Sequence, residues 1–208
     1  MPIKDNREYR NFKLGIEERA DGDEERIVTG YASTFDEPYT LFSGVGYEFR
    51  EVVDKGAFDK TDMADVIFQY NHEGRVFART KNNTLDVKPD DKGLFITANL
   101  GGTEIGRELF DEIRGGYTDK MSFGFTVTDE AEEREKTDSG VTIYTRHIKA
   151  VGKLYDVSAV SIPANDATSI SVRKLNDGLI ERLKAERLKE QRTETLRRAL
   201  QVKAKSLK

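Results

Sequence analysis

One serine of the chain stands in a setting that would suit a nucleophile. Ser122 lies in residues 119–127, where large apolar and small residues alternate with a period of two, and this pattern predicts a half-buried strand. On such a strand Ser122 shares a face with Gly124, and a glycine leaves room for another group to approach closely. Ser122 could therefore attack a carbonyl, provided that the fold supplies a base, a group that orients the base, and donors for an oxyanion.

The base must come from a small set, because the chain contains only two histidines, His72 and His147. His72 follows the short apolar run 66–70 and lies just before a glycine. A histidine at the end of a strand can point into a cleft. His147 lies among polar and charged residues in the middle of the expected strand 141–150, where we expect surface exposure. Of the two histidines, His72 is therefore the better candidate for a base.

An imidazole base needs an acceptor at its second nitrogen, which fixes the tautomer and stabilises the imidazolium. Asp156 is the most suggestive acceptor. It stands near the start of the run 154–162, on the same face as Ser158. A carboxylate in an otherwise apolar strand requires a partner or solvent, and a histidine would be an adequate partner. His147 stays open as the alternative third member.

Other chemistry lacks its usual sequence signals. The chain has no GxSxG elbow, no GxGxxG loop and no Walker loop. Two separated histidines without the HExxH spacing, together with the absence of cysteine, argue against zinc. We expect neither a cofactor nor a metal.

Composition limits the classes of protein that fit. The chain has 208 residues, of which 37% are hydrophobic and 35% charged, and its mean hydropathy is -0.65. This length predicts one domain plus an appendage, or at most two small domains. The N-terminus has no apolar segment of a secretory signal, and no apolar run approaches the roughly 20 residues of a membrane span. The net charge of -4 gives no reason to expect specific nucleic-acid binding.

The elements that must position these residues are mostly short strands. We predict strands at 26–35, 47–53, 66–70, 77–80, 84–88, 93–100, 120–127, 141–150 and 154–162, with an edge strand near 12–16. Residues 90–93 predict a hairpin turn. The charged stretch 129–139 is expected to be a mobile excursion. This succession predicts a mainly β fold, a barrel or sandwich with peripheral helices.

Two helical segments complete the expected architecture. Thr103 is a candidate N-cap for a helix whose apolar stripe includes Leu109 and Ile113, and Gly115 ends it. From about residue 175 the apolar spacing becomes helical, and residues 179–208 hold ten Lys or Arg against four Glu. This basic arm could be a solvated helical tail or a helix that docks on an acidic partner or on other subunits.

Several segments together resemble one family, the prohead (capsid maturation) proteases of tailed bacteriophages, which are related in fold to the herpesvirus assemblins. The matching segments occur in the order of the family and cover roughly residues 26–173: GYASTFD (30–36), EVVDKGAFDK (51–60), FQYNHEGRVFART (68–80), DDKGLFITANL (90–100), KMSFGFTV (120–127) and LYDVSAVSIPAND (154–166). On this basis the chain divides into a protease domain, residues 1–174, and the basic helical arm, residues 175–208.

The resemblance implies a serine endopeptidase on an assemblin-like β-barrel. By position, Ser122 is the nucleophile, His72 the general base and Asp156 the acid that orients His72. In the assemblins the third member is itself a histidine, which keeps His147 open.

The biology that the resemblance implies is cleavage of the major capsid protein precursor and of scaffold segments, followed by self-cleavage. These steps take place inside the prohead, in the host cytoplasm. The portal or other prohead components and further copies of the chain are the remaining expected partners. Two alternatives are a catalytically silent assembly or scaffold protein of the same fold and an esterase that uses the same nucleophile.

Overall fold

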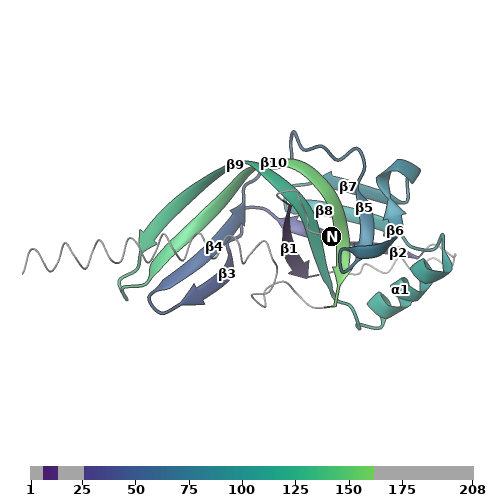
Figure 1. Ribbon diagram of the computed structural model, residues 1–208, viewed down its shortest axis with the longest axis horizontal. Helices are drawn as coiled ribbons and strands as arrows, with labels where there is room; N and C mark the ends of the chain where they lie inside the picture. Colours follow the sequence, from purple (N-terminus) through teal and green to yellow (C-terminus); the bar gives the residue numbers. More distant parts are fainter. Residues whose placement is uncertain (1–6, 14–25, 162–208) are drawn as a thin grey trace, which may run out of the picture. The chain divides into compact units, whose positions relative to one another are not determined.

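The described part of the chain is mainly β. The computed structural model describes residues 7–13 and 26–161, all within one compact unit (Figure 1). It contains one α-helix, α1 (Glu104–Arg114), a 3-10 turn at Thr80–Asn82, and ten strands. The strands are β1 (Glu8–Lys13), β2 (Ile27–Thr34), β3 (Tyr39–Gly44), β4 (Tyr47–Val53), β5 (Ile67–Tyr70), β6 (Glu73–Arg79), β7 (Leu85–Pro89), β8 (Gly93–Asn99), β9 (Lys120–Lys136) and β10 (Thr142–Val160).

The strands form two sheets. One has the order β1-β9-β10-β4-β3, with β5 also paired to β10 and β6 paired to β5, and the other has the order β2-β8-β7. The predicted mainly β class is confirmed. Ladder pairing among the described strands does not close them into a barrel, so the closed barrel stays a prediction. The predicted helical arm, 175–208, lies outside the described residues.

The longest element is the hairpin of β9 and β10, which Figure 1 shows bent into an arch. The prediction of a mobile excursion at 129–139 is wrong, because β9 continues to Lys136 and pairs with β10 along this length. The acidic side chains stand at largely exposed strand positions, which require no core. Register shifts fall between Ile148 and Asp156, and such bulges bend a strand without ending it. They therefore produce one bent strand where two were predicted.

A second difference from the predicted elements is β3, Tyr39–Gly44, for which no strand was predicted. It forms a hairpin with β4 and is half exposed along its length. Its six residues lack a clean apolar alternation, so the pattern gave no signal. Positive φ at Gly46, 81°, lets the two strands connect tightly.

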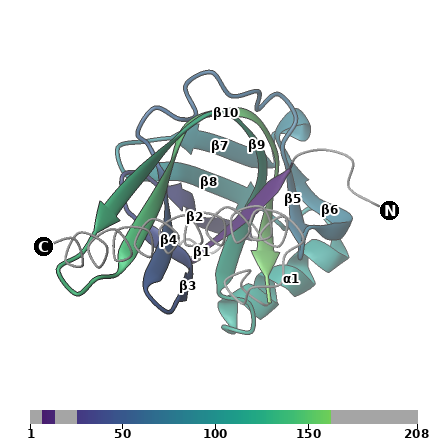
Figure 2. The same cartoon turned by 60° about the vertical axis from the view of Figure 1, so that its left-hand side comes forward.

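The core determines which way Ser122 faces. Met121, Phe123 and Phe125 are fully buried in the cluster that also contains residues of β2 and β8, and the rings of Phe123 and Phe125 stack at 4.5 Å. Figure 2 shows the β2-β8-β7 sheet within the span of the β9–β10 arch. Because side chains alternate along a strand, Ser122 and Gly124 lie on the opposite face of β9.

The predicted helix is confirmed as α1. The Thr103 hydroxyl oxygen accepts a hydrogen bond from the Gly106 amide at 3.1 Å, which caps the first turn. Leu109 and Ile113 are buried, and the helix ends at Gly115. Across the part of the chain that the structure describes, no helix is long and apolar enough to span a membrane.

Candidate active site

The register of three neighbouring strands places the predicted nucleophile and acid on one face. On β9 and β10, Ser122 pairs with Ser158 and Gly124 pairs with Asp156. On the other side of β9, β1 places Tyr9 opposite Gly124. Directly opposite residues of antiparallel strands share a face. These side chains therefore form the floor of a site on the side of β9 that faces away from the core.

His72 reaches this floor from a tight turn between β5 and β6. Asn71 and His72 form the whole connection, since Tyr70 pairs with Glu73. Both have positive φ, 52° and 60°, as a type I′ hairpin turn requires. The second of these positions usually holds glycine, and a histidine there is uncommon. Backbone strain of this kind gathers at functional sites, and here it aims the imidazole back over the sheet.

The turn is fastened to the end of β10. The Asn71 amide donates to the Ala159 carbonyl at 2.9 Å. The side-chain oxygen of Asn71 accepts a hydrogen bond from the Ser161 amide at 3.0 Å. The side-chain nitrogen of Asn71, Nδ2, donates to the Ser161 hydroxyl at 3.1 Å. Since β5 also runs parallel to β10 beside Asp156, the imidazole has a fixed position relative to that carboxylate.

The three predicted residues meet in one hydrogen-bonded row. The Nε2 atom of His72 lies 2.7 Å from Ser122 Oγ, and its Nδ1 atom lies 2.5 Å from Asp156 Oδ1. Ser122 and Asp156 are 0% and 3% exposed, and the His72 side chain is 18% exposed. An ionised carboxylate can only accept, so Nδ1 carries the proton and Nε2 is left to accept from the Ser122 hydroxyl.

Two neighbours hold the Asp156 carboxylate. The buried Ser158 hydroxyl donates to Oδ1 at 2.8 Å, the same oxygen that accepts from His72. At Gly124, a methyl group would stand only 2.3 Å from Asp156 Oδ2. The missing side chain of Gly124 is therefore what allows the carboxylate to occupy its position.

Tyr9 packs against the ring of His72. The two ring centroids are 4.3 Å apart with an interplanar angle of 59°. Burial of the phenol and the negative charge of Asp156 raise the pKa of Tyr9. Tyr9 therefore stays neutral at physiological pH and adds to the apolar cover over the imidazole.

The structure places His147 elsewhere. Its Nδ1 lies 2.8 Å from Asp54 Oδ1 and its Nε2 lies 3.5 Å from Glu133. It is Asp156, and not His147, that contacts His72. Within the described ranges, no group of His, Asp or Glu side chains is arranged to hold a metal ion.

Three contributors to the site were not predicted as site residues. Ser158 was noted only for sharing a face with Asp156, and that period-two spacing was the available signal. Asn71 and Tyr9 gave no signal, because their roles depend on the turn and on the pairing of β1 with β9.

This arrangement supplies a hydroxyl, a base that can take its proton, and a carboxylate that holds the base in the required tautomer. Those are the parts that nucleophilic acyl transfer needs.

Comparison with known proteins identifies a family. The family model described as the caudovirus prohead serine protease matches residues 13–179, which is most of the chain. The solved structure of the bacteriophage T4 capsid assembly protease, gp21, is similar at a TM-score of 0.40 and 12% identity, over 74% of this chain and 96% of that one. None of the curated proteins matches.

Proposed function

Because the chain belongs to the caudovirus prohead serine proteases, we propose that it is an endopeptidase of capsid maturation with Ser122, His72 and Asp156 as its catalytic residues. The observation that carries this proposal is the unbroken row from Ser122 Oγ through His72 to Asp156 Oδ1, with contacts of 2.7 and 2.5 Å.

The reaction begins when His72 Nε2 takes the hydroxyl proton of Ser122 as Oγ attacks a peptide carbonyl. Asp156 stabilises the imidazolium that forms. His72 then gives this proton to the amine as the peptide C–N bond breaks. The acyl group stays bound to Ser122 Oγ. Water, activated by His72 in the same way, releases the acyl group and restores the serine.

The proposed substrates are the capsid protein precursor and scaffold segments inside the prohead, in the host cytoplasm. Portal proteins and further copies of the chain are other proposed partners. The fold that we propose for the protease is the assemblin-like β-barrel. Self-cleavage is proposed for the arm, residues 175–208. Residues 129–136, where trimming would otherwise be expected, pair in a ladder with β10, and a protease needs an unpaired extended segment.

The test is co-expression with the capsid precursor of the same virus, followed by mass spectrometry of the products. We expect Ser122→Ala to leave the precursor intact. The control variant is Ser139→Ala, which changes a serine in the turn between β9 and β10 that contacts Thr137. We expect the control protein to cleave the precursor like the wild type. Cleavage by the Ser122→Ala protein at the control rate would refute the proposal.

A further inference from the structure

The edge of β9 beside Ser122 is occupied by another part of the same chain. β1 pairs with β9 over six residues, from Glu8 opposite Phe125 to Lys13 opposite Lys120, and Asn11 lies directly opposite Ser122. With β10 on the other side, both edges of β9 are paired at the nucleophile. Ser122 is 0% exposed in this arrangement, so a peptide carbonyl cannot reach its hydroxyl.

From this pairing we infer that β1 is an internal ligand of a strand-binding site at residues 120–125 of β9, and that an extended substrate peptide has to replace it. This inference rests on the proposed function. The partner that fits the site is an extended chain, because a strand edge binds by main-chain hydrogen bonds and selects alternate side chains.

Among the described strands, β1 pairs only with the catalytic part of β9. Among the strands that the structure describes, the rest of β9, residues 126–136, pairs with β10 alone. The family match begins at residue 13, so nearly all of β1 precedes the part of the chain that matches the family. Figure 1 shows β1 beside one limb of the arch, next to β9.

The geometry explains why β1 is bound without being attacked. In a ladder the carbonyls of a strand lie in the plane of the sheet and bond to the neighbouring strand. Ser122 Oγ points out of that plane toward His72. A substrate must therefore turn its scissile carbonyl out of the ladder at Ser122, whereas β1 runs past it.

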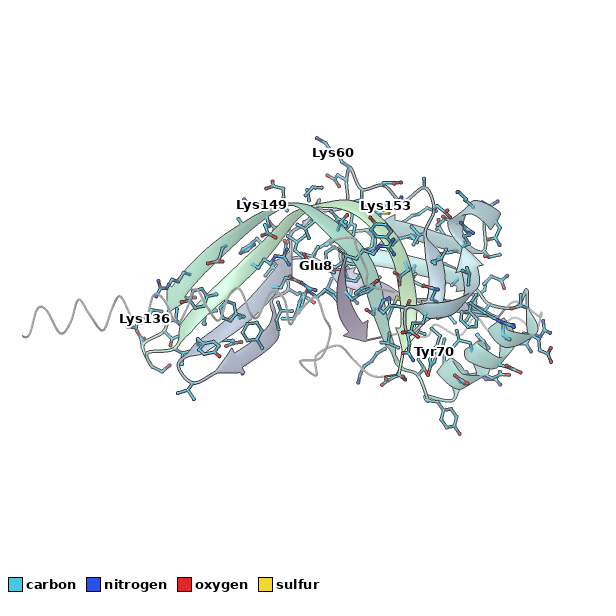
Figure 3. The ribbon with its side chains drawn as sticks, in the orientation of Figure 1. Glu8, Lys60, Tyr70, Lys136, Lys149 and Lys153 are labelled. Atoms are coloured by element: carbon cyan, nitrogen blue, oxygen red, sulfur yellow. The ribbon has the colours of Figure 1, made fainter. Side chains whose placement is uncertain are left out.

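Side chains on both faces of β1 hold it in place. On the catalytic face, the Tyr9 ring lies against His72. On the other face the buried Arg10 donates to Glu51 Oε2 of β4 at 2.7 Å. Arg146 of β10 donates to both oxygens of Glu8, at 2.5 and 2.8 Å. Glu8, the first residue of β1, is labelled in Figure 3.

The same ion network allows β1 to leave. Glu51 also accepts from Arg146 at 3.0 Å and from the Tyr39 hydroxyl. Its buried carboxylate therefore keeps two donors when Arg10 departs, and the large cost of an unpaired buried charge is avoided.

A reversible staple tests the inference on the full chain. The protein has no cysteine, and Lys13 lies directly opposite Lys120, a spacing of about 4.5 to 5.5 Å between Cα atoms that a disulfide can bridge. The variant Lys13→Cys/Lys120→Cys fixes β1 when oxidised. The control Lys136→Cys/Thr142→Cys joins another opposed pair, at the far end of the β9–β10 hairpin (Figure 3).

The readout is the rate at which a fluorophosphonate probe labels Ser122, which needs no knowledge of the natural substrate. We expect oxidation of the Lys13–Lys120 staple to slow labelling at least 20-fold and dithiothreitol to restore it, with no redox effect in the control. Equal rates for the oxidised and reduced staple would overturn the inference and leave the proposed function intact. Failure of the reduced staple and of the wild type to label would instead contradict the proposed function.

A second variant tests the direction of the effect. Arg10→Ala weakens the anchoring of β1 without touching the catalytic face. We expect several-fold faster labelling of Ser122 than in the wild type. A rate equal to or below the wild-type rate, in a protein with unchanged circular dichroism, would contradict the assignment of β1 as a displaceable ligand.

Discussion

Gly124→Ala is the most informative single change near the catalytic row. Gly124 lies on β9 two residues after Ser122 and opposite Asp156. The added methyl group would stand 2.3 Å from Asp156 Oδ2 and 2.7 Å from a ring carbon of Tyr9. Neither Ser122 nor His72 is altered, so the change acts on the orienting carboxylate and on the cover of the site.

The size of the effect follows from the required movement. Ordinary contact begins at 3.4 Å, so the carboxylate has to move by about 1 Å, and a misplacement of that size costs on the order of 100-fold in rate. At 1.36 kcal/mol for each factor of ten, this corresponds to about 2.7 kcal/mol of transition-state stabilisation. Asp156 cannot make this movement and keep its 2.5 Å contact with His72.

The assay is the rate of capsid precursor cleavage by purified protein. The matched control is Gly102→Ala, since a methyl group at Gly102 meets nothing within 4 Å. We expect the control to keep the wild-type rate and Gly124→Ala to lose about 100-fold. A Gly124→Ala protein that folds normally and cleaves within threefold of the control would refute the reasoning that the carboxylate of Asp156 must hold this position.

Three further changes test other contacts. Asp156→Asn removes the carboxylate that holds the His72 tautomer, and we expect kcat to fall by up to about 10⁴-fold, whereas an unchanged kcat would eliminate the orienting role. Ser158→Ala removes one hydrogen bond to Asp156, worth about 1 kcal/mol, so we expect a roughly fivefold lower kcat with an unchanged KM, restored in part by Ser158→Thr. Burial alone would raise the pKa of Glu8, but the hydrogen bond and charge of Arg146 and the charge of Arg10 hold it below the ordinary 4.5. The ionised Glu8 therefore stabilises the fold above that pH, and the difference in melting temperature between wild type and Glu8→Gln should shrink as the pH falls below about 4.5; a constant difference would contradict this.

Local patterns predicted what depends on local sequence. The alternation around Ser122 identified its strand and the face it shares with Gly124, because residues on one face of a strand are two apart. The cap at Thr103 and the stop at Gly115 bounded the helix for the same reason: both signals lie within a few residues of the ends they define. The meeting of Ser122, His72 and Asp156 came from the resemblance to a family, since no local pattern brings together residues 34 and 50 positions apart.

Long-range pairing was not predictable in this way. The charged end of β9 is a strand because β10 lies beside it, and its own composition indicated a mobile segment. The role of Tyr9 depends on a pairing between residues more than a hundred positions apart. Ser158 could have been proposed as a partner of Asp156, because the two lie on one face of one strand, but nothing in the sequence says which of its neighbours a buried hydroxyl contacts.

Mapping of the covalent adduct formed with a fluorophosphonate tests the central claim most directly. The wild-type protein is allowed to react to completion and is then digested and sequenced by mass spectrometry, beside His72→Ala under the same conditions. The catalytic row predicts a single adduct on Ser122 in the wild type and almost none in His72→Ala. An adduct on a different residue, or equal modification of Ser122 in the two proteins, would contradict it.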